Sequence, residues 1–226
     1  GEVGLILDVG AELLSRIFDP KIDSMVATLD DRSKEWSPLA EIKEVSDIDR
    51  LAGLLVHVPD RGGEWQKHAR VFVSGCLAAL HRKGKGNNEM LMYMLTRMPI
   101  ESLAKAIPAT HTAQSFLRPG NEKMFESVRS TASTACAGLS GLHPKAGFGG
   151  WSICSWVDMS DSCPSWLFVP IPAKLDQMGK SLASLVASVY VDAVVSLSEQ
   201  SDRRLWFIAD EIGQYPAISA FPRALT

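Results

Sequence analysis

A short apolar run that ends in two adjacent acids constrains this chain more than any other stretch. Leu205-Trp-Phe-Ile-Ala-Asp210-Glu211 follows the basic pair Arg203-Arg204 and has five apolar residues before the two carboxylates. An apolar run of this length predicts a strand that is buried on both faces, as in a parallel sheet. The acids then lie at the carboxyl end of the strand, where open α/β sheets bind their ligands.

Two acids in this position suit nucleotide hydrolysis. Asp210 can hold Mg²⁺, directly or through water, and Glu211 can polarise the water that attacks a γ-phosphate. Gln214 lies three residues after Glu211, where a side chain can sense the γ-phosphate, and a structural role for Gln214 is an equal alternative. The simpler alternative for the two acids is a strand that ends in solvated carboxylates.

Composition narrows the class of protein. The chain has 226 residues, of which 46% are hydrophobic and 22% charged, and its net charge is −3, so charge does not predict a general affinity for nucleic acid. The four cysteines have no CxxC spacing and are expected to be reduced, mostly buried thiols, as in a cytosolic protein, rather than a disulfide framework. No apolar run approaches membrane-spanning length and no signal peptide is recognisable, so we expect a soluble segment.

The order of the apolar patterns predicts an α/β fold that a helical block interrupts. Runs at 3–7 and 165–169 predict two more buried strands, and a long helical pattern at 175–197 joins the second run to the strand that ends in the acids. The intervening helices are expected at 46–58, 65–80, 89–98, 100–107, 110–117 and 121–139. We therefore expect three segments: 1–58 as the first part of the α/β domain, 59–143 as an all-α domain, and 144–226 as the rest of the α/β domain.

Two features of the helical block invite a binding function. Four methionines, Met90, Met92, Met94 and Met98, lie close together, and methionine serves both irregular cores and pliable binding surfaces. We favour core filling. The basic turn at 82–88 can contact a phosphate backbone, but a solvated loop is the favoured interpretation.

Several short strings occur in a fixed order along nearly the whole chain. They are Asp8-x-x-x-Glu12, Phe18-Asp-Pro, Asp31-Arg-Ser-x-x-Trp36-x-Pro38, Ser127-Val-Arg-Ser-Thr-Ala-Ser, Ser152-Ile-Cys-Ser-Trp-Val, Trp166-Leu-Phe-Val-Pro and Leu205-Trp-Phe-Ile-Ala-Asp-Glu-Ile. Each is weakly specific alone. Together the chain resembles the cytoplasmic ATPase domain of type IV secretion coupling proteins, the TraD/TrwB-like conjugation motors.

The resemblance implies a RecA-like nucleotide-binding domain with a parallel sheet, interrupted by an all-α insertion domain. It implies a homo-hexameric, ATP-driven pump at the cytoplasmic face of the bacterial inner membrane, with ATP and Mg²⁺ as cofactors of the complete protein. By position, Asp210 is the acid on the Mg²⁺ side and Glu211 the catalytic base. The implied partners are relaxosome or secreted substrate proteins that bind the all-α domain, single-stranded DNA, and components of the secretion channel.

The chain also departs from the pattern of this family. No Gly-x-x-x-x-Gly-Lys-Ser/Thr phosphate loop occurs in it, and Gly84-Lys85-Gly86 lacks both the spacing and the hydroxyl that such a loop needs. At Cys154-Ser155 the family usually has a charged pair, which puts a polar contact there in doubt. We therefore expect a fragment that needs no cofactor and does not hydrolyse ATP by itself.

Two alternatives remain open at this stage. An FtsK/HerA-like DNA-pumping ATPase has the same mechanism, but the long helical insertion argues against it. A non-catalytic module that docks substrate proteins for a secretion system suits the near-neutral charge and the missing phosphate loop. A phosphate loop behind two membrane-spanning helices in the upstream coding sequence would favour the coupling ATPase.

Overall fold

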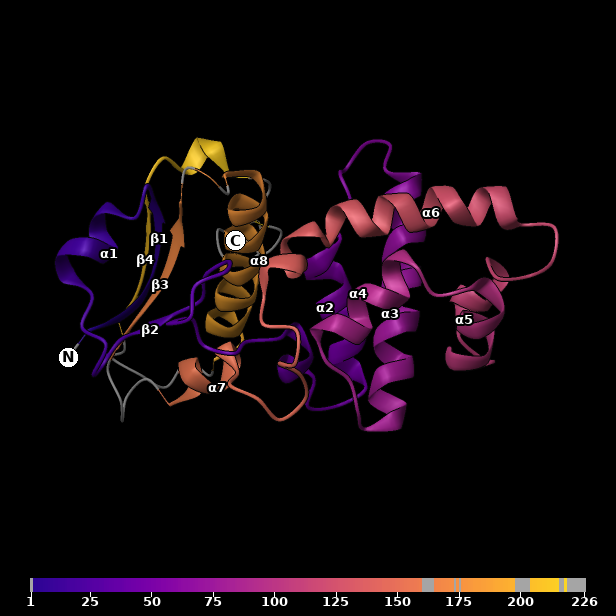
Figure 1. Ribbon diagram of the computed structural model, residues 1–226, viewed down its shortest axis with the longest axis horizontal. Helices are drawn as coiled ribbons and strands as arrows, with labels where there is room; N and C mark the ends of the chain where they lie inside the picture. The colour runs from indigo at the N-terminus through magenta and orange to yellow at the C-terminus, as the bar shows by residue number, and fades with distance from the viewer. Residues whose placement is uncertain are drawn as a thin grey trace. The chain divides into compact units, whose positions relative to one another are not determined.

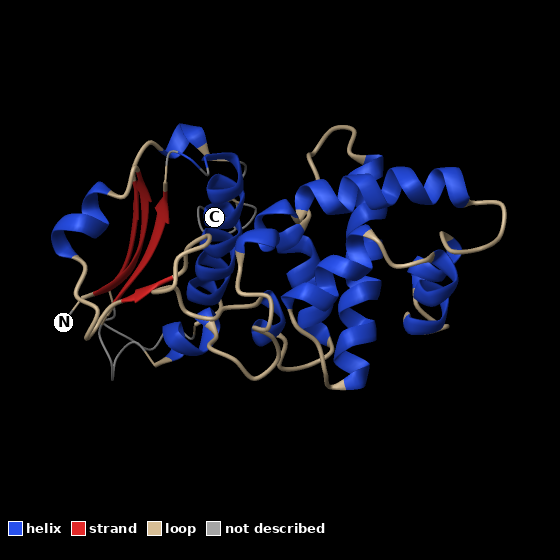
Figure 2. Cartoon of the chain, viewed as in Figure 1, coloured by secondary structure: helices blue, strands red, loops and turns tan. Residues whose placement is uncertain are grey.

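The computed structural model describes residues 2–159, 165–172, 174, 176–197, 204–215 and 218. The chain divides into two compact units, a sheet unit (1–36, 141–143 and 150–226) and a helical unit (37–140 and 144–149). All strands of the described residues belong to the sheet unit (Figure 2).

The sheet unit contains four parallel strands in the order β2-β3-β1-β4. They are β1 (Val3–Val9), β2 (Ser24–Met25), β3 (Trp166–Ile171) and β4 (Leu205–Ala209). Leu7 of β1 is in register with Ala209 of β4, and Asp8 with Pro170 of β3, so these three strands end at one edge. The predicted α/β class with a parallel sheet is confirmed, and the strand predicted before the two acids is present.

One helix covers each face of the sheet (Figure 1). Helix α1 (Glu12–Ile17) packs Leu14 into a buried cluster with Ile6 and Phe168. The long helix α8 (Asp176–Val195) packs on β3 and β1 from the other side, and the Tyr190 hydroxyl donates to the Trp206 carbonyl at 3.0 Å. Since α8 follows β3 and precedes β4, it is the crossover that parallel strands require.

Helix α8 differs from expectation in one respect. The stretch Gln177–Val195 is long and apolar enough to cross a membrane, although no run of that length was expected from the sequence. Within the apolar window of this stretch, 67% of the sequence is buried inside the fold. This is the pattern of a core helix that packs on a sheet.

Strand β4 corrects a second expectation, because it is not buried on both faces. Trp206 is 42% exposed and Ile208 is 39% exposed. Both follow from the position of β4 at the end of the strand order: α8 covers one of its faces, whereas α1 packs on the other face over β1 and β3. A Cβ on Gly4 would come within 2.6 Å of the Trp166 ring and of the Trp206 carbonyl, so this part of the sheet surface requires glycine.

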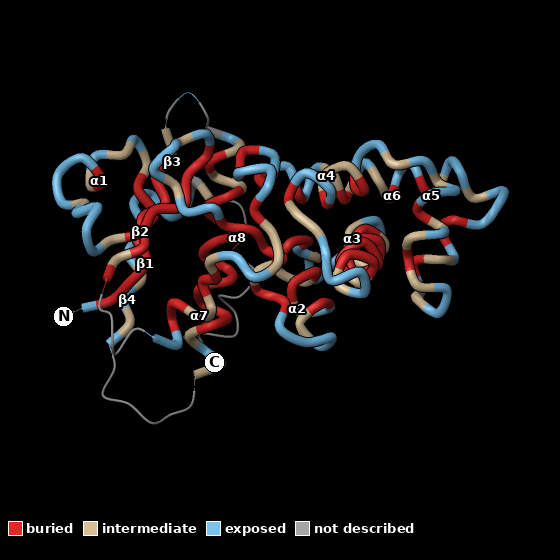
Figure 3. Tube along the Cα trace, turned by 60° about the horizontal axis from the view of Figure 1, so that its bottom comes forward, coloured by how far each residue is buried: buried red, intermediate tan, exposed pale blue. Residues whose placement is uncertain are grey.

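The helical unit is built around its longest helix, α3 (Glu64–Lys83). The other elements are η1 (Pro38–Glu41), α2 (Ser46–Leu55), α4 (Asn88–Thr96), α5 (Ile100–Ala106), η2 (Thr112–Ser115), α6 (Glu122–Ala135) and η3 (Ala137–Gly141). Buried residues gather along α3, as they do along α8 in the sheet unit (Figure 3). At the centre, the fully buried rings of Phe72 and Phe125 meet edge to face, with centroids 5.1 Å apart.

The helical unit begins at Ser37, earlier in the chain than the boundary expected at residue 59. The physical reason is that α2 packs on α3, and the Arg70 guanidinium donates to the Val56 carbonyl at 2.9 Å. The helix expected at 110–117 is only the short 3₁₀ turn η2, in which the Gln114 amide donates to the carbonyls of Ala104 and Ile107. Helix α7 (Ile153–Asp158) belongs to the sheet unit and is capped by the Ser152 hydroxyl.

Candidate functional site

The two acids that end β4 lie beside the end of β1. The Asp210 N–H donates to the Leu7 carbonyl at 3.1 Å, so the residue directly after β4 is still hydrogen-bonded to the central strand β1. Asp8, the next residue of β1, therefore has Asp210 as its neighbour across the sheet. This places acids from two adjacent parallel strands at one carboxyl edge, the position at which α/β sheets bind ligands.

Asp8 is fully buried and holds helix α1 in place. Its carboxylate accepts hydrogen bonds from the backbone N–H groups of Leu13, at 3.2 Å, and Leu14, at 2.7 Å. These are N–H groups of the first turn of α1, which lack partners within the helix. Asp8 thus has a structural function at this edge. The sequence signal for Asp8 is the same as that for Asp210: each acid directly follows a run of apolar residues.

Glu211 has a backbone conformation that is rare for a residue with a side chain. Its φ of 51° and ψ of 48° lie in the left-handed region, and it precedes the 3₁₀ turn η5 (Ile212–Gln214). Asp210 and Glu211 are both exposed. Strained backbone at the exposed end of a strand is common at functional sites, where it fixes the direction of a side chain.

Tyr215 completes the edge and was not identified from the sequence. Its hydroxyl oxygen is buried and has no hydrogen-bond partner among the residues that the structure describes. Burial and the negative charges of Asp210, Asp8 and Glu211 raise the pKa of Tyr215 to about 12, so the hydroxyl keeps its proton. An unpaired buried hydroxyl costs free energy, which is regained when a ligand provides an acceptor. Tyr215 follows Glu211 by four residues, but a tyrosine at that spacing carries no signal, and only the fold brings it near Asp8.

The donors at this edge suit Mg²⁺ that is bound together with a phosphate group. Mg²⁺ usually keeps several waters and takes one or two carboxylates besides phosphate oxygens. Asp210 can supply such a carboxylate, and the Tyr215 hydroxyl can donate to an oxygen. Within the described residues no three His, Cys, Asp or Glu side chains gather into a metal site by themselves. The side chain of Gln214 lies outside the described part of the chain.

Comparison with known proteins identifies the family of this chain. Residues 1–226 match the family described as the type IV secretion-system coupling protein DNA-binding domain. The chain belongs to this family. Coupling protein TraD of Escherichia coli (strain K12) is 24% identical to it over 219 residues, which are 94% of the chain and 30% of TraD.

Solved structures of the plasmid coupling protein TrwB have the same fold. The structure of TrwB in complex with ADP and Mg²⁺ and that in complex with the ATP analogue ADPNP each superpose with a TM-score of 0.85 and 25% identity. Each match covers 100% of the chain and 54% of the TrwB chain. The chain therefore spans 30% of the length of TraD and 54% of the TrwB chains.

Proposed function

We propose that this chain is part of the ATP-driven motor of a type IV secretion coupling protein. The observation that carries the proposal is the edge at which Asp210, Glu211 and Tyr215 meet, in a fold that TrwB shares while binding ADP and Mg²⁺. The family match favours a coupling protein over an FtsK/HerA-like pump. In the complete protein, ATP and Mg²⁺ are the proposed cofactors, with the phosphate loop supplied outside these residues.

Each residue of the edge has a proposed part in hydrolysis. Asp210 anchors Mg²⁺, directly or through water, and the metal neutralises charge on the phosphates. Glu211 accepts a hydrogen bond from the attacking water and orients it towards the γ-phosphate. Gln214, at the end of η5, remains the candidate sensor of the γ-phosphate. Asp8 contributes indirectly by holding α1 at the same edge.

The helical unit is proposed to recruit the cargo. We propose that it binds relaxosome or secreted substrate proteins, with single-stranded DNA as a second cargo, and that the sheet unit provides the energy for transfer into the secretion channel. The proposed assembly is a homo-hexamer at the cytoplasmic face of the bacterial inner membrane. The family description, which names a DNA-binding domain of coupling proteins, supports DNA as a cargo.

The test is Glu211→Gln in the complete coupling protein. The amide keeps the size of the side chain but is a poor acceptor for a water proton, so ATP turnover should fall by at least about 100-fold. Nucleotide affinity should change by less than about three-fold, because Glu211 acts on water rather than on the nucleotide. Turnover within about ten-fold of wild type would refute the role of Glu211. The absence of ATP turnover in the wild-type complete protein would favour the non-catalytic docking module.

A further inference from the structure

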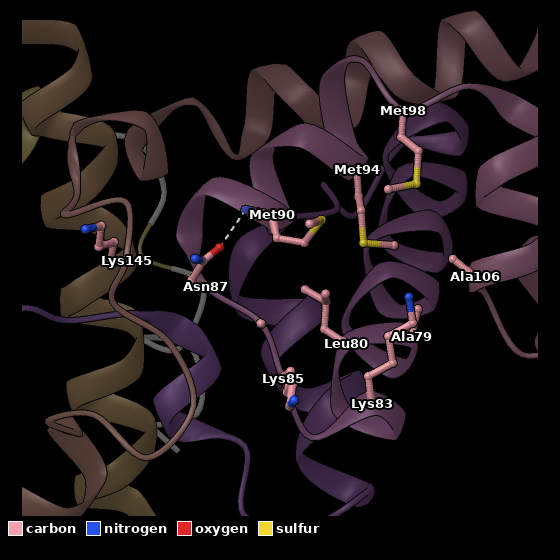
Figure 4. A pocket seen from close by; sticks show the side chains of 11 residues that line it. Ala79, Leu80, Lys83, Lys85, Asn87, Met90, Met94, Met98, Ala106 and Lys145 are labelled. Carbon is pink, nitrogen blue, oxygen red and sulfur yellow. Dashed lines mark hydrogen bonds between the residues drawn. The ribbon is translucent and has the colours of Figure 1, made fainter.

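The helical unit contains a hollow beside its methionines. A cavity of about 400 Å³ lies between α3, α4 and α5. Leu80 forms part of its apolar wall, and Met90, Met94 and Met98 lie along another side (Figure 4). Protein interiors are close-packed and have few voids larger than a water molecule. A hollow of this size is instead within the range of ligand pockets.

The methionines are not all core residues. Met94 is 2% exposed and fills the core as predicted, but Met90 is 42% exposed, so core filling is the wrong interpretation for it. The three side chains follow one another at one-turn spacing along a single face of α4 and the residues after it. Unbranched thioether side chains adjust to apolar groups of different shape, which suits a site that accepts variable sequences.

The margin of the cavity is positively charged. Lys83 and Lys85 line it and are exposed, and Lys145 lines it beyond Asn87. The lining of this described cavity contains no aspartate or glutamate. A lysine ammonium is a mobile point charge that pairs with carboxylates of varied geometry.

The elements that form the cavity are joined by contacts in which the methionine side chains and the lysine ammonium groups take no part. The Arg82 guanidinium donates to the Ala106 carbonyl at 3.0 Å, which joins the end of α3 to α5. The Asn87 side chain accepts from the Met90 N–H at 2.8 Å and begins α4. Gly147 allows the chain to pass close to Gly86, because a Cβ on Gly147 would lie 2.0 Å from the Gly86 carbonyl. The cavity is therefore a fixed feature of the helical unit with adaptable side chains inside it.

We infer that this cavity is a docking site for an acidic amphipathic peptide segment of a cargo protein. Its apolar side chains, spaced one helical turn apart, would enter between Leu80 and the methionines, and its carboxylates would pair with Lys83 and Lys85. The inference rests on the proposed function, in which the helical unit recruits cargo. It adds the site and the chemistry of the segment that is recognised.

The probe is a fluorescein-labelled peptide of about twelve residues, with leucines at one-turn spacing and glutamates between them. Its binding to the 226-residue chain is measured by fluorescence anisotropy. A matched peptide with lysine in place of every glutamate should bind at least about ten-fold more weakly. Affinity for the acidic peptide should fall as salt is raised, because the lysines are exposed.

Matched variants locate the site. The double variant Lys83→Glu/Lys85→Glu should weaken binding at least about ten-fold. Lys123→Glu, an exposed lysine of α6 outside the cavity, should leave it within about two-fold. Met90→Ala should weaken binding several-fold, and Met159→Ala, at an exposed methionine of the sheet unit, should not. Circular dichroism verifies that each variant is folded.

Three outcomes would overturn the inference: no saturable binding, equal binding of the lysine peptide, or unchanged affinity of the double variant. Capture of the chain by phosphatidylglycerol vesicles without competition from the peptide would also overturn it, because the margin would then recognise lipid. Cross-linking of cargo to the helical unit in the complete protein tests the docking site separately from the proposed function. Cross-linking that survives the double variant leaves the proposed function intact and refutes only this site.

Discussion

The two units of this chain differ in where they place backbone strain. Among the described residues, the non-glycine residues with positive φ are Ala11, Leu29 and Glu211, and all three belong to the sheet unit. Ala11 follows β1 and Glu211 follows β4. The described helical unit has no such residue, and its cavity between α3, α4 and α5 is lined by flexible methionines and lysines. The difference teaches that the sheet unit fixes groups in space, as hydrolysis needs, whereas the helical unit offers adaptable contacts, as recruitment needs.

The largest effect is expected in the core of the helical unit. Phe125→Ala should lower the free energy of unfolding by about 3–5 kcal/mol, because it removes a fully buried ring that packs on Phe72. Chemical denaturation measures it. Trp65→Ala is the control, since Trp65 is 48% exposed, and should cost less than about 1 kcal/mol. Equal losses for both variants would contradict the assignment of this core.

A smaller loss is expected at the edge of the sheet unit. Asp8→Ala removes the acceptor of the Leu13 and Leu14 N–H groups and should destabilise the chain by about 1–2 kcal/mol. Asp8→Asn keeps one acceptor oxygen and should lose about half as much. Denaturant titration compares the two, and an Asp8→Ala variant as stable as wild type would show that Asp8 does not hold α1.

Relief of strain should stabilise the chain at the expense of function. Glu211→Gly permits the left-handed conformation at no steric cost and should raise the free energy of unfolding by up to about 1 kcal/mol. Glu211→Gln keeps the strain and should be neutral in the same thermal melts. Destabilisation by Glu211→Gly would contradict the view that this residue is held against its own preference.

The smallest change in stability is expected for Tyr215→Phe. This variant removes a hydroxyl that has no hydrogen-bond partner within the described part of the chain, and it should alter the free energy of unfolding by less than about 0.5 kcal/mol at neutral pH. The raised pKa of Tyr215 predicts the direction in which stability changes with pH, and this direction can be tested. Between pH 10 and 12 the unfolded chain loses this proton and the folded chain keeps it, so Tyr215 lowers stability as pH rises through that window. The tyrosinate absorbance lost in Tyr215→Phe should have its midpoint near pH 12. A midpoint near 10 would show that the hydroxyl is neither buried nor close to the acids.

Local sequence patterns predicted the helices and strands better than they predicted which other elements pack beside each of them. The run 205–209 is a strand because its residues are apolar. The exposure of Trp206, however, depends on the position of this strand in the strand order, which is a property of the whole sheet. The acids were found because Asp210 and Glu211 follow a strand directly. Tyr215 was missed because its meaning comes from burial and from three carboxylates, one on β1 and two in the turn after β4. Met90 was misassigned because periodicity identifies a helical face without saying whether another element covers it.

The account depends most on Asp210 as the acid that holds Mg²⁺, and one binding measurement tests it. In the complete coupling protein, the affinity of a fluorescent ADP analogue is titrated with and without Mg²⁺ for wild type, Asp210→Asn and Glu211→Gln. We predict that Mg²⁺ tightens binding at least about ten-fold in wild type and in Glu211→Gln, and less than about two-fold in Asp210→Asn. An Asp210→Asn variant that keeps the full effect of Mg²⁺ would contradict the account.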